Sequence, residues 1–197
     1  MIPRVGLLSW LFGRRSRLLD DRIYATCGDR DRGFVDAVAT RSGAGEPVLI
    51  VAHDPENLVR ACTALREAGI AFEARSSYRA DGATQALTVA ALPDPGPAHE
   101  AGPAWAVHAV DIHRDSREND RLLHIVDAMP AGASLRHFLA LDDPLLRHFA
   151  GPQVTGLLER LGLKDGEAIE SSMVTRSVRR ALKKLEATEA AAPNQPA

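Results

Sequence analysis

The strongest constraint on the fold is an unbroken apolar run, PVLIVA (residues 47–52). Such a run is typical of a strand that is covered on both faces. Asp54 and Pro55 follow as a helix N-cap and a first helical residue, and Gly69 ends the helix. IAFEAR (residues 70–75) predicts the next strand. This strand, helix, strand order predicts a right-handed crossover within a mostly parallel sheet.

The rest of the chain extends this α/β pattern. Apolar residues within 29–40 indicate a helix, and further strands are predicted at residues 86–92, 105–112 and 135–141. PDPGPAHEAGP (residues 93–103) is predicted to be a loop because of its proline and glycine content. Near the end of the chain, two apolar stripes at helical spacing are expected to cover the sheet: Val154, Leu157, Leu158 and Leu161, and then Val174, Val178, Ala181 and Leu185.

Composition excludes several classes of function. The 197 residues carry a formal net charge of -2, so we expect no nucleic-acid partner. Cys27 and Cys62 belong to no CxxC or Cys/His cluster, which excludes a disulfide framework or a zinc site of the usual spacing. Cys62 falls on a helical apolar stripe and is expected to be a core thiol. We therefore expect a reducing, cytosolic compartment.

The titratable residues show no catalytic pattern. The seven histidines form no HExxH or comparable pair, so structural or surface roles are favoured and no metal is expected. Asp142 and Asp143 precede Pro144, which favours an N-cap role for one of them over a catalytic carboxylate pair. No GxSxG elbow is present in the sequence.

Two basic regions are candidate contact surfaces. The first 19 residues combine an apolar run with a basic cluster, but the run is far shorter than the about 20 residues of a membrane span. Either this segment packs on the domain or frays, or it forms an interfacial anchor. The anchor residues would be Trp10, Phe12, Arg14, Arg15 and Arg17. The last helix is basic, and Arg179 and Lys183 could dock an acidic surface or anionic lipid, although a solvated face explains the pattern equally well.

A longer stretch near the end carries a family resemblance. The segment FLALDDPLLRHFAGPQVTGLLERLGLKDGEAIESSMVTRSVRRALKKLEA (residues 138–187) resembles the second motor domain of SecA, the bacterial preprotein translocase ATPase. DRIY (21–24), GEPVLIVAHDPEN (45–57), AGIAFEAR (68–75) and AVHAVDIHRDSREND (106–120) resemble it more loosely. The resemblance implies a RecA-like α/β domain of the P-loop NTPase type over residues 21–187, with residues 1–20 as a separate segment. An unstructured tail is expected from residue 188, because these residues include no apolar side chains able to pack.

Several nucleotide motifs of that family have no counterpart here. The sequence contains no GxxxxGK[ST] loop, which the family carries in its first motor domain. LLHIVDAMPAGAS (residues 122–134) stands in place of the family's QxxGRxGRQGD and has neither arginine nor glutamine. The loop at residues 93–103 replaces NMAGRGTDI. Since an arginine finger contributes about 10³ to 10⁵ in rate, the resemblance implies that hydrolysis is not the role. The chain also stops where the family begins its scaffold helix.

Three functions remain open at this point. The first is a SecA-like, non-catalytic accessory or regulatory module of protein export, located in the cytoplasm or peripherally at the inner membrane. It would bind SecA or another translocase component and require no cofactor, with ATP suggested by the resemblance alone. Arg114 and Arg117, in the mixed-charge run at residues 113–120, are its candidate contacts to a phosphate or a partner carboxylate. The alternatives are one half of a split translocase ATPase and a RecA-like fold reused for an unrelated interaction.

Overall fold

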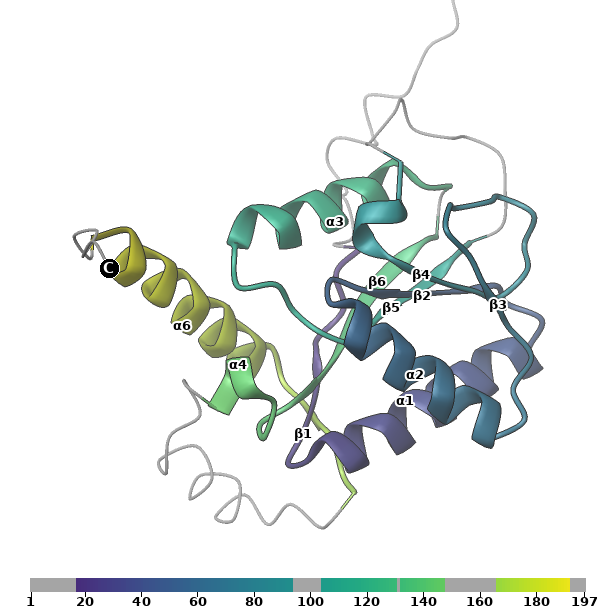
Figure 1. Ribbon diagram of the computed structural model, residues 1–197, viewed down its shortest axis with the longest axis horizontal. Coiled ribbons are helices and arrows are strands. Elements are labelled where there is room, and N and C mark those ends of the chain that lie inside the picture. The colour runs from purple at the N-terminus through teal and green to yellow at the C-terminus, as the bar shows by residue number, and fades with distance from the viewer. Residues whose placement is uncertain (1–16, 94–103, 131, 148–165, 192–197) are drawn as a thin grey trace, which may run out of the picture.

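A seven-stranded sheet organises the computed structural model, which describes residues 17–93, 104–130, 132–147 and 166–191 (Figure 1). Its order across the sheet is β3-β4-β2-β5-β6-β1-β7. The strands are β1 (Arg22–Tyr24), β2 (Val48–Ala52), β3 (Glu73–Ala74), β4 (Gln85–Thr88), β5 (Ala106–Ala109), β6 (Ser134–Ala140) and β7 (Ile169–Glu170). Neighbouring strands are parallel except for β7, which pairs antiparallel with β1. The predicted mostly parallel α/β sheet is confirmed.

Helices cover both faces of this sheet. The helices are α1 (Cys27–Gly43), α2 (Pro55–Glu67), α3 (Ser116–Ala128), α4 (Pro144–Arg147) and α6 (Ser172–Ala191), with a short 3-10 turn, η2 (Val89–Ala91). Helices α1 and α2 lie against one face and α3 against the other (Figure 1). Helix α6 packs beside α4 at the β1 side, where Leu182 joins Ile23 and Leu139 in a small apolar cluster.

Strand β2 shows why the sheet is buried on both sides. All five of its residues are 0% exposed, as the apolar run predicted. Leu49 and Val51 pack on the α3 side, and Ile50 packs on the α1 and α2 side, because successive strand residues point to opposite faces. Both layers therefore depend on this one strand.

Local signals at the helix ends fold as expected. The Asp54 carboxylate accepts a hydrogen bond from the Glu56 N–H at 2.8 Å, and Pro55 is the first residue of α2. Gly69 has a φ of +69° at the end of that helix, a conformation that glycine adopts at little cost. Gly33 of α1 lies against Tyr24 so closely that a Cβ atom there would come within 2.0 Å of the tyrosine oxygen.

Several predicted boundaries were wrong. The strand expected at residues 70–75 is only Glu73–Ala74, because the Ile70 N–H bonds to the Leu65 carbonyl and completes the end of α2. The strand expected at 86–92 is Gln85–Thr88, and η2 follows it. The strand expected at 105–112 is shorter, Ala106–Ala109. Strands β1 and β7 were not predicted as strands.

The end of the chain also differs from expectation. Helix α6 continues to Ala191, so an unstructured tail does not begin at residue 188. Alanine and glutamate are strong helix formers, which favours this extension of the helix. The helix predicted around residues 154–161 and most of the predicted loop at 93–103 lie outside the described residues.

Candidate functional site

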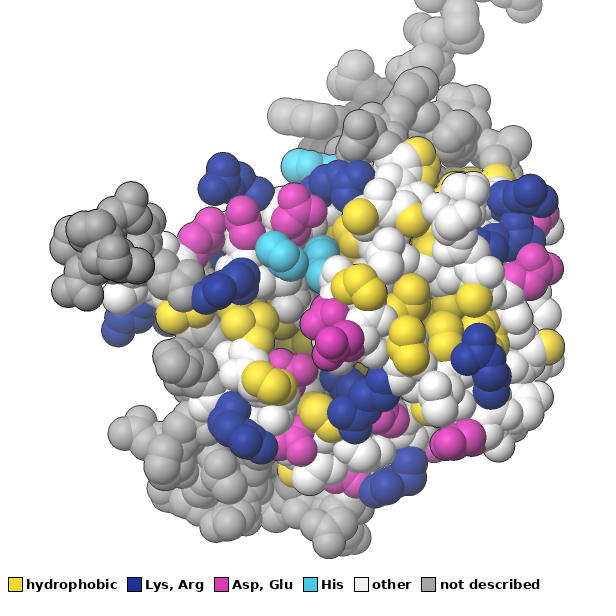
Figure 2. Space-filling view, viewed as in Figure 1, with side chains coloured by type: hydrophobic (Ala, Val, Ile, Leu, Met, Phe, Trp, Pro, Cys, Tyr) yellow, Lys and Arg dark blue, Asp and Glu magenta, His cyan; other side chains and the backbone are white. Residues whose placement is uncertain are grey.

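A cleft of about 980 Å³ lies at the edge of the sheet where β2, β5 and β6 end. We call it the carboxyl-edge cleft. Ligands of open parallel sheets bind at this edge. Its lining includes His53, Asp54, Glu56, Asn57, Arg60, Asp111, His113, Arg114, Asp143 and Leu145. Acidic, basic and histidine side chains intermingle on the face shown in Figure 2, so no single sign of charge dominates it.

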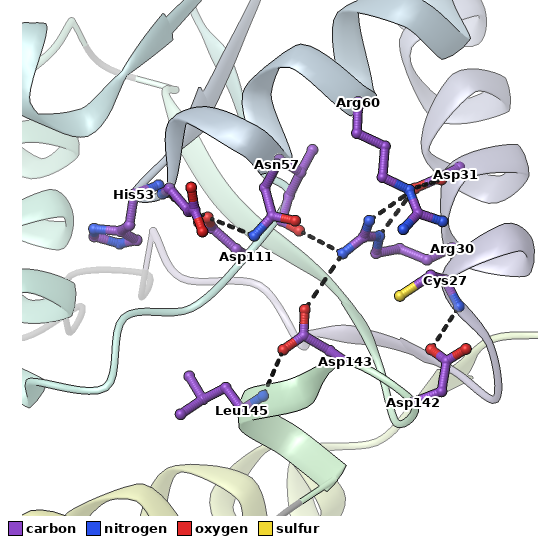
Figure 3. A network of polar contacts seen from close by, with 12 residues as sticks. Cys27, Arg30, Asp31, His53, Asn57, Arg60, Asp111, Asp142, Asp143 and Leu145 are labelled. Carbon is purple, nitrogen blue, oxygen red and sulfur yellow. Dashed lines mark hydrogen bonds and ion pairs between the residues drawn. The ribbon is translucent and has the colours of Figure 1, made fainter.

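Asp111 fixes the wall between β5 and α2 (Figure 3). Its carboxylate accepts hydrogen bonds from the backbone N–H groups of His53 and Asp54, at 2.8 and 2.9 Å, and from the Asn57 amide at 3.2 Å. The residue is 7% exposed, and burial raises the pKa of this carboxyl more than the three donors lower it. The sequence signal for this role was a lone carboxylate directly after a buried strand.

Asp142 and Asp143 cap two different helices. The Asp143 carboxylate accepts from the Leu145 N–H at 2.9 Å, which confirms the predicted N-cap of the helix that begins at Pro144. The Asp142 carboxylate instead accepts from the Cys27 N–H at 2.7 Å, at the start of α1. This second contact joins residues 115 positions apart, so no local pattern indicated it.

Beside the cleft, two arginines and one aspartate connect α1 and α2. Arg30 is 2% exposed and donates to the Val110 carbonyl at 3.2 Å and to the Asp31 carboxylate at 2.9 Å. It also lies 3.9 Å from the Asp143 carboxylate. Arg60 donates to the other oxygen of Asp31 at 2.6 Å (Figure 3). These guanidinium groups are therefore paired within the chain.

The remaining titratable groups of the cleft do not support nucleophilic or metal chemistry. Burial and then the charge of His113 lower the pKa of His53 to about 3, and the two imidazole rings lie 5.2 Å apart. Burial and a hydrogen bond with Asp142 raise the pKa of the Cys27 thiol to about 11, so thiolate is scarce at neutral pH. Among the described residues, no group of three or more His, Cys, Asp or Glu could hold a metal ion.

The structure separates the two arginines predicted as phosphate or partner contacts. Arg114 lines the cleft and is exposed. Arg117 lies on α3, where its guanidinium is 3.3 Å from the Asp115 carboxylate and its side chain is 85% exposed. Arg117 is not part of the cleft lining. Only Arg114 is thus placed at the candidate site.

Of the residues predicted to contact a membrane or a partner, two bond within the fold, one is exposed and the rest lie outside the described residues. Arg17 donates to the Val126 and Met129 carbonyls at 2.6 and 2.9 Å, which caps the end of α3 inside the fold. Arg179 donates to the buried Asp21 carboxylate at 3.1 Å, whereas Lys183 is exposed on α6. Trp10, Phe12, Arg14 and Arg15 lie outside the described residues. None of the helices in the described part has the length and apolar character of a membrane span.

The segment that stands in place of the arginine-finger motif forms the second half of α3 and the turn into β6. Its Leu122, Ile125 and Val126 are buried in the core on the α3 face. This segment leads into the start of β6, whereas the cleft lies where β6 ends. The residues present here therefore serve packing.

Comparison with known proteins shows which proteins this chain is similar to. No family model matches the chain. Protein translocase subunit SecA from Polaromonas sp. is 43% identical over 79 residues, or 40% of this chain, and SecA from Desulfovibrio desulfuricans is 54% identical over 54 residues, or 27% of it. SecA from Methylococcus capsulatus is 28% identical over 211 aligned positions that cover 86% of this chain. The chain carries a SecA-like domain.

This SecA-like domain corresponds to a limited part of its relatives. The chain spans 9%, 6% and 23% of the lengths of those three proteins. The similarity confirms the resemblance found in the sequence, and the parallel sheet with helices on both faces is the RecA-like fold that it implied.

Proposed function

We propose that the SecA-like domain acts in protein translocation as a module that binds another protein and does not hydrolyse nucleotide. Translocation is supported by the names of its relatives, all protein translocase subunits in the comparison. The partner that we favour is SecA or another translocase component, because the relatives of this domain are translocase subunits.

The observation that carries this proposal is the occupation of helix N-termini along the carboxyl edge. Phosphate binds at such ends because free N–H groups point at it. Here the N–H group of Glu56 in α2 bonds to Asp54, that of Cys27 in α1 bonds to Asp142, and that of Leu145 in α4 bonds to Asp143. The N–H groups of His53 and Asp54, just before α2, bond to Asp111. A nucleotide phosphate would have to displace carboxylates that already fill these positions.

The charge of the cleft points the same way. Four carboxylates line it: Asp54, Glu56, Asp111 and Asp143. Two arginines line it, Arg60 and Arg114, and Arg60 is paired with Asp31. These carboxylates repel the negatively charged triphosphate at short range, so this site is poorly matched to ATP. The residues present do not fit the nucleotide that the family resemblance suggested.

The same cleft has features that suit a protein surface. The lining also contains apolar side chains: Ile112 from the loop after β5, Leu145 from α4 and Leu185 from α6. An apolar centre with polar groups around it is the usual composition of a protein interface. The open carboxylates Asp54 and Glu56 at the start of α2 favour a partner with basic side chains at the rim.

Calorimetric titration and an ATPase assay together test the proposal. ATP and ADP with Mg²⁺ are titrated into the purified chain, and the ATPase rate of SecA from the same organism is measured with and without the chain. We expect no nucleotide binding and a changed SecA rate. Tight nucleotide binding with hydrolysis by the chain alone would overturn the non-catalytic role.

Charge-reversal variants locate the contact. Glu56→Lys changes the rim of the cleft, and Glu67→Lys makes the same change at the other end of α2, away from it. We expect Glu56→Lys to abolish the effect on SecA and Glu67→Lys to keep it. No effect of the unaltered chain on SecA would favour an unrelated interaction role, and hydrolysis only with a separate Walker-type lobe would favour the split ATPase.

A further inference from the structure

A second pocket, of about 370 Å³, lies on the α1 face of the sheet and shares no lining residue with the carboxyl-edge cleft. It opens between the second half of α1 and strands β6 and β1. Three arginines line it, Arg22, Arg41 and Arg136, together with His108 and Phe138. We call it the arginine pocket.

Strand register brings these side chains together. His108 of β5 pairs with Arg136 of β6, and Arg22 of β1 pairs with Phe138 of β6. Arg136 and Phe138 are two residues apart and therefore share one face of the sheet. The Arg22 guanidinium lies 5.8 Å from the centre of the Phe138 ring. The pocket thus has a cationic wall and an aromatic wall on adjacent strands.

Arg136 lacks the partners that a half-buried guanidinium usually has. Its side chain is 21% exposed, and its Nε is buried without a hydrogen-bond partner among the described residues. Arg136 forms an ion pair with Glu170 at 3.3 Å, and Glu170 also pairs with Arg22 at 2.5 Å. One carboxylate is therefore shared by two guanidinium groups that can each donate five hydrogen bonds.

His108 adds a second unsatisfied group beside Arg136. It is 6% exposed, and its Nδ1 is buried without a hydrogen-bond partner in the described part of the chain. Burial, followed by the charges of Arg41, Arg136 and Arg22, lowers the pKa of His108 to about 3. Buried polar atoms in native proteins are normally bonded, so these two leave hydrogen-bonding capacity at the pocket wall that no described residue uses.

We propose that the arginine pocket binds the carboxylate of an aspartate or glutamate side chain of a partner protein, with Arg136 as the principal ligand and the neutral His108 beside it. This inference rests on the proposed role of the chain as a protein-binding module. A planar guanidinium matches a carboxylate through two parallel N–H···O bonds. Leu19, which is half-buried, offers apolar contact for the methylene groups of such a side chain.

The pocket's own charges favour a carboxylate over a phosphate. Asp36 and Glu46 also line it, and Arg41 is paired with Glu46. With Glu170, three carboxylates match the three arginines in number. Because these charges balance, the pocket provides little net attraction to offset desolvation, and desolvation costs more for a phosphate with two negative charges than for a carboxylate with one.

A nuclear magnetic resonance titration tests this proposal on the full chain. The probe is the blocked peptide acetyl-Ala-Glu-Ala-amide, and its matched control is acetyl-Ala-Gln-Ala-amide, both at constant ionic strength and pH 7. The Nε–Hε signals of the arginines and the ring nitrogens of His108 are followed. We expect the Glu peptide to shift the Arg136 and His108 signals in a saturable manner, and the Gln peptide to leave them unchanged.

Variants decide whether Arg136 is the ligand. Arg136→Gln should weaken binding of the Glu peptide at least tenfold, and Arg136→Lys should weaken it less. The control Arg75→Gln changes an arginine near the opposite edge of the sheet. Its Nε is also without a partner among the described residues, but its guanidinium is paired with Glu73 and with Asp81, so its loss should leave binding unchanged. Thermal unfolding of each variant checks that it is folded.

Three results would overturn the inference: equal binding of the Gln peptide, tighter binding of inorganic phosphate than of the Glu peptide, or unchanged binding by Arg136→Gln. These failures are separable from failure of the proposed function. If the chain still alters the ATPase rate of SecA while the Glu peptide does not bind, the arginine pocket is excluded and the translocation module stands.

Discussion

The carboxyl-edge cleft and the arginine pocket belong to the same sheet but satisfy their charged groups differently. In the cleft, Asp111 accepts from three donors, and beside it the buried Arg30 donates to a carbonyl and a carboxylate. In the pocket, Arg136 shares one carboxylate with Arg22, and its Nε has no partner among the described residues. The difference separates charged groups that hold the fold from one that is available to a ligand.

Replacement of Arg30 should have the largest effect on stability. Arg30→Met removes a buried charge and leaves Asp31 with Arg60 alone and Asp143 without its cationic neighbour. We expect a loss of about 4 kcal/mol in the free energy of unfolding, as for other broken buried pairs. Urea denaturation measures it. The matched control Arg32→Met alters an arginine of the same helix whose side chain is 71% exposed, and should cost less than about 1 kcal/mol.

Asp111→Ala should be the next most damaging change. It leaves the N–H groups of His53 and Asp54 and the amide of Asn57 without their common acceptor. Unsatisfied buried donors cost about 1 to 3 kcal/mol, so we expect a loss of about 3 kcal/mol. Amide hydrogen exchange at residues 53–57 should accelerate. If exchange there were unchanged, Asp111 would not hold the start of α2.

A pH series should distinguish Asp111 from a second buried aspartate, Asp21. Burial would raise the pKa of Asp21, but the hydrogen bond and charge of His137, together with Arg179, hold it below its ordinary value of 3.8. The stability from Asp21 is therefore present above pH 3.8 and is lost as pH falls through its lowered folded-state pKa. Asp111 has a raised pKa, so its contribution has the opposite sign and is lost as pH rises above 3.8.

The corresponding variant is Asp21→Asn. It weakens the contacts to Arg179 and His137, and we expect a loss of about 2 kcal/mol at neutral pH. The stability difference between the unaltered chain and this variant should shrink below pH 3.8, as measured by thermal unfolding across the pH range. A constant difference would mean that Asp21 does not titrate at a lowered pKa.

The sequence predicted those parts of the fold whose cause is local. The apolar run of β2, the Asp54 and Pro55 helix start, and the Asp143 cap each depend on neighbours in the chain. Strands β1 and β7 have three and two residues, too few to show alternation. They form because the longer β6 offers an edge to β1 and β1 offers one to β7.

Most of the site was beyond sequence prediction for a related reason. Arg17 caps a helix 109 residues away, and Asp142 caps one 115 residues away, so only the fold brings them into contact. The arginine pocket draws on three strands and a helix. One signal was present: Arg136 and His137 interrupt the apolar run of β6, where a buried strand has little room for charge.

Arg136→Gln should have the smallest effect on stability and provides the sharpest test of the comparison. Burial lowers the pKa of Arg136, Glu170 raises it, and the charges of Arg22 and Arg41 lower it further. The surroundings therefore stabilise the charged guanidinium less than water does. Removing this charge leaves Glu170 paired with Arg22 alone. We expect the free energy of unfolding, measured by urea denaturation, to change by no more than about 0.5 kcal/mol or to rise slightly. A loss above about 2 kcal/mol would place Arg136 with Arg30 as a residue that holds the fold. The missing partners of its guanidinium would then no longer argue for a ligand, because its contribution to stability alone would account for an arginine at this position.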